Sequence, residues 1–344
     1  MLDPLFLSSG LFFGWSLGAN DAANVWGPAV GARMVKFIKA ALLCGLFVTL
    51  GSVLSGSGGS HTIGAFASIK TLSGAFIIAF SAALTVFWMT RVRMPVSNTH
   101  AVAGSIIAWN LFSATPVDYQ TLYKIVGSWF FSPVLTGIFA ALLYKLISGF
   151  LRRRPLHILH LDSLNRKALI IAGILGSYSL GANNIGNVIG VFVPVSPFRD
   201  ILLSPGIIFS STQQLALIGG LSIGLGVLTY SKKVMLTVGK DIYKLSPLMS
   251  FVVILSSSLV LFLFASKELQ NLMVSLGLPA FPLVPISSSQ SIVGGVLGIG
   301  LSENLYNINY GILKRIFLAW ITTPVAAGLL SFLLFSLQAI LGAV

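Results

Sequence analysis

Long apolar segments follow one another along nearly the whole chain. Each has roughly 18 residues or more, the length at which a helix crosses the ~30 Å hydrocarbon core of a bilayer. The ten segments lie near 5–27, 37–56, 71–90, 95–113, 120–149, 168–194, 206–230, 246–266, 285–302 and 316–342. Only 8% of the 344 residues are charged, and the mean hydropathy is +0.94, which excludes an ordinary water-soluble domain. The sequence therefore predicts an all-α polytopic membrane protein.

The positive charge of the chain indicates orientation. A formal charge of +13 would favour a nucleic-acid partner in a soluble protein, but in a membrane protein Lys and Arg gather in the cytoplasmic loops. Sixteen of the 21 Lys and Arg residues fall in the loops of one side if all ten segments cross. We therefore expect a cell-membrane protein with both termini outside, a cytoplasmic basic linker at 151–167 and no nucleic-acid partner. The first segment lacks the basic region of a cleaved signal peptide, so we expect it to be retained.

Three motifs occur twice, in the same order. SLGANDAANVWG at 16–27 returns as SLGANNIGNVIG at 179–190. PVSNTHAVAGSIIA at 95–108 aligns with PISSSQSIVGGVLG at 285–298, and SWFFSPVLTGI at 128–138 aligns with AWITTPVAAGL at 319–329. We therefore divide the chain into two repeats, 1–150 and 168–344, which the linker 151–167 joins.

The number of segments in each repeat predicts how the two repeats are oriented in the membrane. Five segments in each repeat is an odd number, so the second repeat begins on the opposite face of the membrane from the first. Inverted repeats of this kind are typical of secondary transporters, whose binding site lies near the bilayer midplane between the repeats. A repeat that serves structure alone is the alternative.

Each dodecapeptide places polar side chains in an apolar segment. Such groups cost several kcal/mol each in lipid unless they face a polar cavity or one another. The glycines would allow the helix to break there, and the freed carbonyls together with side-chain oxygens are ligands that suit Na⁺. We expect a site for a coupling ion, Na⁺ or H⁺, and no other cofactor. Its candidate residues are Asn20, Asp21, Asn24, Asn183, Asn184 and Asn187. Asp21 could instead be held by a structural partner such as His100.

The second motif of each repeat is typical of a helix N-terminus. A proline is followed by a polar cluster and then by a short Gly-rich apolar run. Free N–H groups and the positive end of the helix dipole bind oxyanions at such a position. The candidate substrate-binding residues are Ser97, Asn98, Thr99, Ser287, Ser288, Ser289 and Gln290. Ordinary capping is the alternative, and 95–112 and 285–302 could either span the membrane or re-enter it.

Two pairs of motifs resemble the duplicated signatures of the PiT inorganic phosphate transporter family, which includes a sulfate permease branch. The first pair is GANDAANVWGPAVGA with GANNIGNVIG, and the second is MPVSNTHAVAG with VPISSSQSIVGG. The stretch TVGKDIYKLSP at 237–247 is similar to a further family element. The resemblance implies an inverted repeat with two re-entrant hairpins, alternating access and often a homodimer. It also implies cation ligands and oxyanion contacts at the two sets of residues given above.

The chain departs from the family pattern in three places. Asn184 stands where phosphate transporters usually carry a second aspartate, Asn98 interrupts the hydroxyl pair of the first hairpin, and Gln290 replaces its counterpart histidine. One carboxylate fewer predicts fewer coupled cations. Sulfate only accepts hydrogen bonds, so phosphate and sulfate both stay open as substrates, with phosphate favoured.

Two other classes of function compete with a carrier. A passive anion channel fits the symmetry but leaves the intramembrane Asp21 unexplained. An intramembrane hydrolase could use Ser97, His100 and Asp21, although the second repeat keeps the serines and loses the other two. No zinc spacing or phosphate loop is present, so we expect neither an enzyme nor ATP-driven transport.

Overall fold

The computed structural model describes residues 3–91, 96–153, 157–237, 245–303 and 310–342, and these are largely helical. The first half contains α1 (Asp3–Gly31), α2 (Phe37–Ser55), α3 (Ser57–Ala67), α4 (Leu72–Arg91), α5 (Asn98–Phe112) and α6 (Tyr119–Arg153). The second half contains α7 (Ile158–Ile189), the 3-10 helix η1 (Gly190–Val195), the strands β1 (Ile201–Ser204) and β2 (Ile207–Phe209), α8 (Ser211–Thr237), α9 (Pro247–Leu263), α10 (Lys267–Ser275), α11 (Ser288–Glu303) and α12 (Tyr310–Ile340). The structure thus confirms the all-α class.

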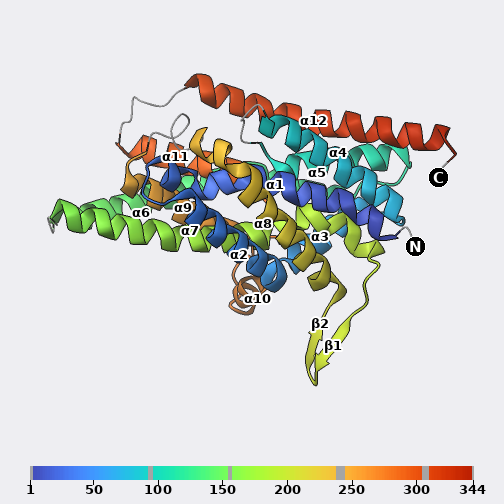
Figure 1. Ribbon diagram of the computed structural model, residues 1–344, viewed down its shortest axis with the longest axis horizontal. Helices are drawn as coiled ribbons and strands as arrows, with labels where there is room; N and C mark the ends of the chain where they lie inside the picture. The colour runs from blue at the N-terminus through green and yellow to red at the C-terminus, as the bar shows by residue number, and fades with distance from the viewer. Residues whose placement is uncertain (1–2, 92–95, 154–156, 238–244, 304–309, 343–344) are drawn as a thin grey trace.

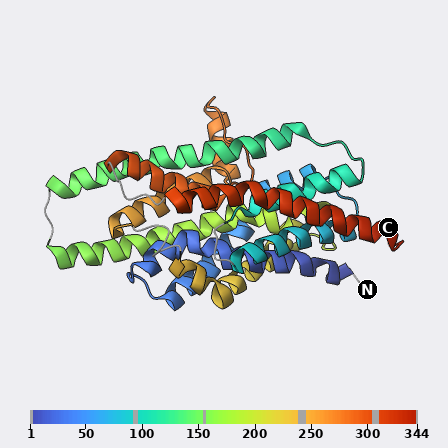
Figure 2. The same cartoon turned by 90° about the horizontal axis from the view of Figure 1, so that it is seen from above.

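The long helices α6, α7 and α12 run along the long axis of the molecule (Figures 1 and 2). The start of α1 and the end of α12 lie toward one end of this axis, and the end of α6 and the start of α7 lie at the other end (Figure 1). β1 and β2 form an antiparallel hairpin that projects away from the helices. Large apolar side chains such as Leu142, Ile321 and Leu329 are exposed on α6 and α12, as expected of surfaces that face lipid.

Fewer of the described helices have both the length and the hydropathy typical of a membrane span than the ten predicted segments suggest. Among the described residues, six helices are long and apolar enough, and the pair α9 and α10, bent by 71°, would be a seventh span. α5 and α11 have only 15 and 16 residues, about 22–24 Å of helix, which is too short to cross the ~30 Å core. The helices α3 and α10 and the β-hairpin were not predicted from the sequence. A linker was also predicted at 151–167, where α6 in fact continues to Arg153 and α7 begins at Ile158.

The prediction that the helices break within the dodecapeptides is wrong, because α1 passes through the whole of its motif and α7 continues through its motif to Ile189, with only Gly190 in η1. The glycines serve close helix packing instead. A Cβ on Gly18 would collide with the carbonyl oxygen of Ile223 in α8, and one on Gly181 would collide with that of Val48 in α2. Small residues let backbones approach in this way inside a bilayer, where no hydrophobic effect drives helices together.

The packing of the first half recurs in the second half. α1 packs against α4 and α8, and α7 packs against α9 and α2. α5 packs against α4 and α12, and α11 packs against α9 and α6. The two short helices α5 and α11 are thereby held inside the bundle, each between a helix of its own half and a long helix of the other half.

Candidate functional site

The polar residues of both dodecapeptides lie inside the protein. On α1, residues 20, 21 and 24 are spaced so that they project from neighbouring positions of one helix face. On α7, residues 183, 184 and 187 repeat this spacing. All six side chains are at most 1% exposed. Their burial in a chain of this hydropathy means that they must find partners among themselves or on neighbouring elements.

The N-termini of α5 and α11 begin at buried caps, as the sequence predicts. The Ser97 hydroxyl accepts a hydrogen bond from the backbone N–H of His100 at 3.3 Å, and Ser287 accepts one from Gln290 at the same distance. Ser97–Thr99 and Ser287–Gln290 are all buried. The Thr99 hydroxyl donates to the carbonyl oxygen of Ile286 at 3.4 Å, so the two helix starts meet.

Hydrogen bonds between the two halves join the dodecapeptides to these helix starts. The Asn24 amide donates to the Ser288 hydroxyl at 3.1 Å, and the Asn187 amide donates to the Thr99 hydroxyl at 3.1 Å. The Asn184 amide donates to Asp21 Oδ2 at 3.3 Å. The structure therefore brings predicted ion-binding and anion-binding residues into one buried cluster, which contains Asp21, Asn24, Asn184, Asn187, Thr99 and Ser288, and Asp21 and Asn184 are direct partners within it.

Asn20 and Asn183 have a role that the sequence analysis missed. Asn20 Oδ1 accepts from the backbone N–H of Val96 at 3.3 Å, and Asn183 Oδ1 accepts from that of Ile286 at 2.8 Å. Both contacts hold the extended chain just before a short helix. Because these oxygens are already engaged, the two asparagines position the helix starts. The repeated motif was the only sequence signal, and it gave no indication of this backbone contact.

Among the described residues, four buried oxygen atoms in or beside the cluster lack a hydrogen-bond partner. They are Asp21 Oδ1, Asn24 Oδ1, Asn98 Oδ1 and Asn187 Oδ1. Leaving a buried polar atom unpaired is costly, so such atoms indicate a site for a polar ligand. One carboxylate oxygen with three amide oxygens is a ligand set that suits a hard cation. The helix N-termini beside them favour an anion.

The structure does not support the two alternatives that involved His100. Its Nδ1 atom lies 2.8 Å from the carbonyl oxygen of Trp320, so that carbonyl, and not Asp21, is its hydrogen-bond partner there. The Ser97 hydroxyl meets the backbone N–H of His100 and not its ring, which is not the nucleophile–base contact of a hydrolase. The sequence analysis also missed the ring of Trp129, whose centroid lies 3.8 Å from that of the imidazole.

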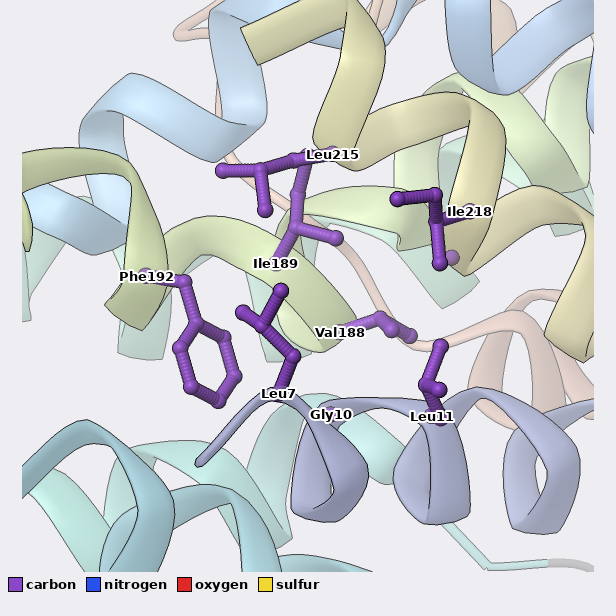
Figure 3. Close-up of a pocket in the computed structure, with 9 residues that line it drawn as sticks. Leu7, Gly10, Leu11, Val188, Ile189, Phe192, Leu215 and Ile218 are labelled. Carbon is purple, nitrogen blue, oxygen red and sulfur yellow. The ribbon is translucent and has the colours of Figure 1, made fainter. Parts of the chain in front are cut away.

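Other parts of the described chain offer less to a polar ligand. Among those residues, no group of three or more His, Cys, Asp or Glu side chains could hold a metal ion. A small pocket between α1, α7, η1 and α8 (Figure 3) has apolar walls, with Leu7, Leu11, Val188, Ile189, Phe192, Leu215 and Ile218 around it. It offers no hydrogen-bonding side chain to an ion.

Comparisons with known proteins identify the family of this chain. A model of the phosphate transporter family matches residues 17–331. A relative from Pyrococcus furiosus is 27% identical over 97% of this chain and 96% of its own length. A relative from Thermococcus kodakarensis is 26% identical over 99% of this chain and 100% of its own length. Both are described as "Putative phosphate permease".

A solved structure is also similar. It is that of "The sodium-dependent phosphate transporter", with a TM-score of 0.81, 25% sequence identity, and coverage of 99% of this chain and 100% of the other. The stretch 238–244, part of the further motif at 237–247, lies outside the described residues. Since the family model spans nearly the whole chain, this protein belongs to the phosphate transporter family, whose members are transporters and not enzymes.

Proposed function

We propose that this protein imports inorganic phosphate across the cell membrane by secondary active transport, with Na⁺ as the coupling ion. The observation that carries the proposal is the buried cluster in which two helix starts, at Ser97 and Ser287, meet beside the carboxylate of Asp21. Membership in the phosphate transporter family supports phosphate as the substrate. The name of the similar solved structure supports Na⁺.

In this proposal the anion lies between the two helix starts. Backbone N–H groups in the first turns of α5 and α11, with the hydroxyls of Thr99, Ser288 and Ser289, donate hydrogen bonds to the phosphate oxygens. Asp21 is the only carboxylate among the described residues of the cluster. It can accept the proton of hydrogen phosphate directly or bind the cation that neutralises the anion.

We further propose that the two halves are inverted repeats that alternate access to the cluster. The recurrence of helix packing in both halves supports this, as does the equivalence of the contacts that Asn20 and Asn183 make to Val96 and Ile286. Three hydrogen bonds connect the two halves at the cluster, and they would change when the halves move relative to each other. They join Asp21 to Asn184, Asn24 to Ser288 and Asn187 to Thr99.

Uptake of labelled phosphate into proteoliposomes tests the proposal. We expect uptake to require an inward Na⁺ gradient and to be lost in Asp21→Asn, because the cation then lacks its carboxylate. Asp162→Asn is the matched control. Asp162 is exposed on α7 and pairs with Arg166 at 3.5 Å. It lies ~30 Å along this helix from Asn183, at 1.5 Å of rise per residue. Uptake driven by a proton gradient alone would contradict Na⁺ coupling.

Two further measurements separate the alternatives. Labelled sulfate, supplied under the same gradients, should enter much more slowly than phosphate; faster sulfate uptake would assign the protein to a sulfate permease function. Counterflow separates a carrier from a channel, because an internal pool of unlabelled phosphate accelerates entry of labelled phosphate only when one site alternates between the two sides. Absence of counterflow would favour the passive channel.

A further inference from the structure

A proline interrupts the hydrogen bonding of α12 close to the binding cluster. Pro324 lies inside α12 and has no backbone N–H, so it cannot donate to the carbonyl oxygen of Trp320, four residues earlier. An unpaired carbonyl inside a membrane protein requires another donor. The structure supplies one from a different element, because the ring of His100 in α5 reaches this carbonyl.

The contact defines the tautomer of His100. Its Nδ1 lies 2.8 Å from the Trp320 oxygen, and since a carbonyl only accepts hydrogen bonds, Nδ1 carries the proton. The opposite ring atom, Nε2, is buried and has no hydrogen-bond partner among the described residues. The ring of Trp129 from α6 covers the imidazole, and the side chain is 3% exposed. The bond to Trp320 and the ring contact with Trp129 thus both hold the imidazole of His100 in place.

His100 is also part of the first turn of α5. Its backbone N–H donates a hydrogen bond to the Ser97 hydroxyl. The preceding residue is Thr99, whose hydroxyl accepts a hydrogen bond from the Asn187 amide. A displacement of the imidazole would rotate this turn. The bond from Nδ1 to Trp320 consequently connects the position of α12 to the geometry of the proposed anion site.

The second half repeats this arrangement of a short helix and a proline-containing long helix, with glutamine in place of histidine. Pro133 lies inside α6 as Pro324 lies inside α12, and α6 packs against α11 as α12 packs against α5. The residue that follows the polar cluster of α11, capped by Ser287, is Gln290. The chain thus uses glutamine at the position equivalent to His100, and a glutamine amide can also donate to a carbonyl.

We propose that His100 is a positioning residue for anion binding, which holds the first turn of α5 against α12 through the carbonyl that Pro324 leaves unpaired. This inference rests on the proposed transport function. His100 does not contact the anion in this scheme. Its role is to keep the N–H groups and the Thr99 hydroxyl directed at the substrate.

The first experiment compares His100→Ala with His100→Gln in phosphate uptake. Loss of the bond should raise the KM of His100→Ala about tenfold, the change that corresponds to one hydrogen bond of roughly 1.4 kcal/mol, with a smaller effect on the maximal rate. His100→Gln retains a donor and should stay within about twofold of the wild-type KM. His61→Ala, a change at an exposed histidine of α3, is the control. An unchanged KM in His100→Ala, or an equal loss in both variants, would overturn the proposal.

The second experiment is independent of transport. Nitrogen NMR of the ¹⁵N-histidine-labelled protein distinguishes the two neutral tautomers, and the resonance absent from His100→Gln identifies His100 among the four histidines. We expect the Nδ1–H form. Observation of the Nε2–H form would refute the contact even if the wild type transports phosphate. Conversely, the Nδ1–H form without phosphate transport would leave the contact standing and reject the proposed function.

A third variant tests the role of the proline. Pro324→Ala gives residue 324 an N–H that can satisfy the Trp320 carbonyl within α12. Added to His100→Ala, it should raise the melting temperature of that variant but leave its elevated KM unchanged, because the helix is repaired while α5 stays unattached. Restoration of the KM by Pro324→Ala would show that the state of α12, and not its attachment to His100, controls binding.

Discussion

At the scale of single residues, Asp21 and Asn184 occupy equivalent positions of α1 and α7 but carry different charges. The amide of Asn184 donates a hydrogen bond to the carboxylate of Asp21. In a transporter with two aspartates, a bound cation or proton would have to compensate the charge at this place. A neutral amide compensates the negative charge only partly. That this chain couples fewer cations than a transporter with two aspartates stays a prediction from the sequence.

Asn184→Asp should increase the demand for cations. Two carboxylates at the 3.3 Å separation of the present pair cannot both be ionised without a counterion between them. We expect a steeper dependence of phosphate uptake on Na⁺ concentration and a lower half-saturating concentration, because the added negative charge attracts the cation more strongly. Asn271→Asp, on the exposed surface of α10, should change neither. Na⁺ titrations of initial uptake rates measure both quantities, and an unchanged steepness would argue against the charge-compensating role of Asn184.

Asn183→Ala should weaken the structure around α11. The substitution leaves the N–H of Ile286 without its acceptor and removes the donor to the carbonyl of Val284. Loss of buried hydrogen bonds of this kind costs about 1–3 kcal/mol. A lower melting temperature of the purified protein in detergent checks this. If Asn183 were a cation ligand instead, the variant would change the Na⁺ dependence of uptake while melting normally.

At the scale of elements, the contact between each short helix and a long helix depends on glycine. A Cβ on Gly104 of α5 would collide with the carbonyl of Pro324 in α12, and one on Gly294 of α11 would collide with that of Pro133 in α6. The Gly-rich runs were visible in the sequence, where they indicated short helices. That they mark close approaches to two proline-containing helices became visible only in the structure.

Gly104→Ala and Gly294→Ala should therefore destabilise the protein. Overpacking against a backbone carbonyl costs roughly 1–3 kcal/mol, and separation of the helices would also displace the buried caps at Ser97 and Ser287. We expect lower melting temperatures and slower phosphate uptake. Gly127→Ala in α6 is the matched control, because a Cβ there meets no atom within 4 Å. Equal melting temperatures for all three variants would contradict the packing argument.

In the whole molecule, the start of α1 and the end of α12 lie opposite the end of α6 and the start of α7 along the long axis (Figure 1). From the positive-inside rule we expect, as from the sequence, that the basic connection between α6 and α7 lies in the cytoplasm and the termini outside. The β-hairpin that contains Pro205 belongs to the loop between α7 and α8, which this orientation places outside together with the termini.

Labelling with a membrane-impermeant maleimide on intact cells tests this orientation. The single native cysteine, Cys44, is buried and should not react. Pro205→Cys in the exposed hairpin should be labelled from outside, and Ser163→Cys in the exposed first part of α7 only after the membrane is opened. The reverse pattern would invert the topology without changing the fold.

Hydropathy and repeated motifs are local properties of the chain, so the membrane class, the two repeats and the candidate residues of the cluster could be predicted from the sequence. The caps of α5 and α11 could be predicted too, since a serine before a helix acts within one turn. The continuity of α1 and α7, the bond from Asn184 to Asp21 and the bond from His100 to the carbonyl of Trp320 could not be predicted in this way. The last two contacts join residues 163 and 220 positions apart, so their geometry depends on how whole helices pack and not on any local pattern.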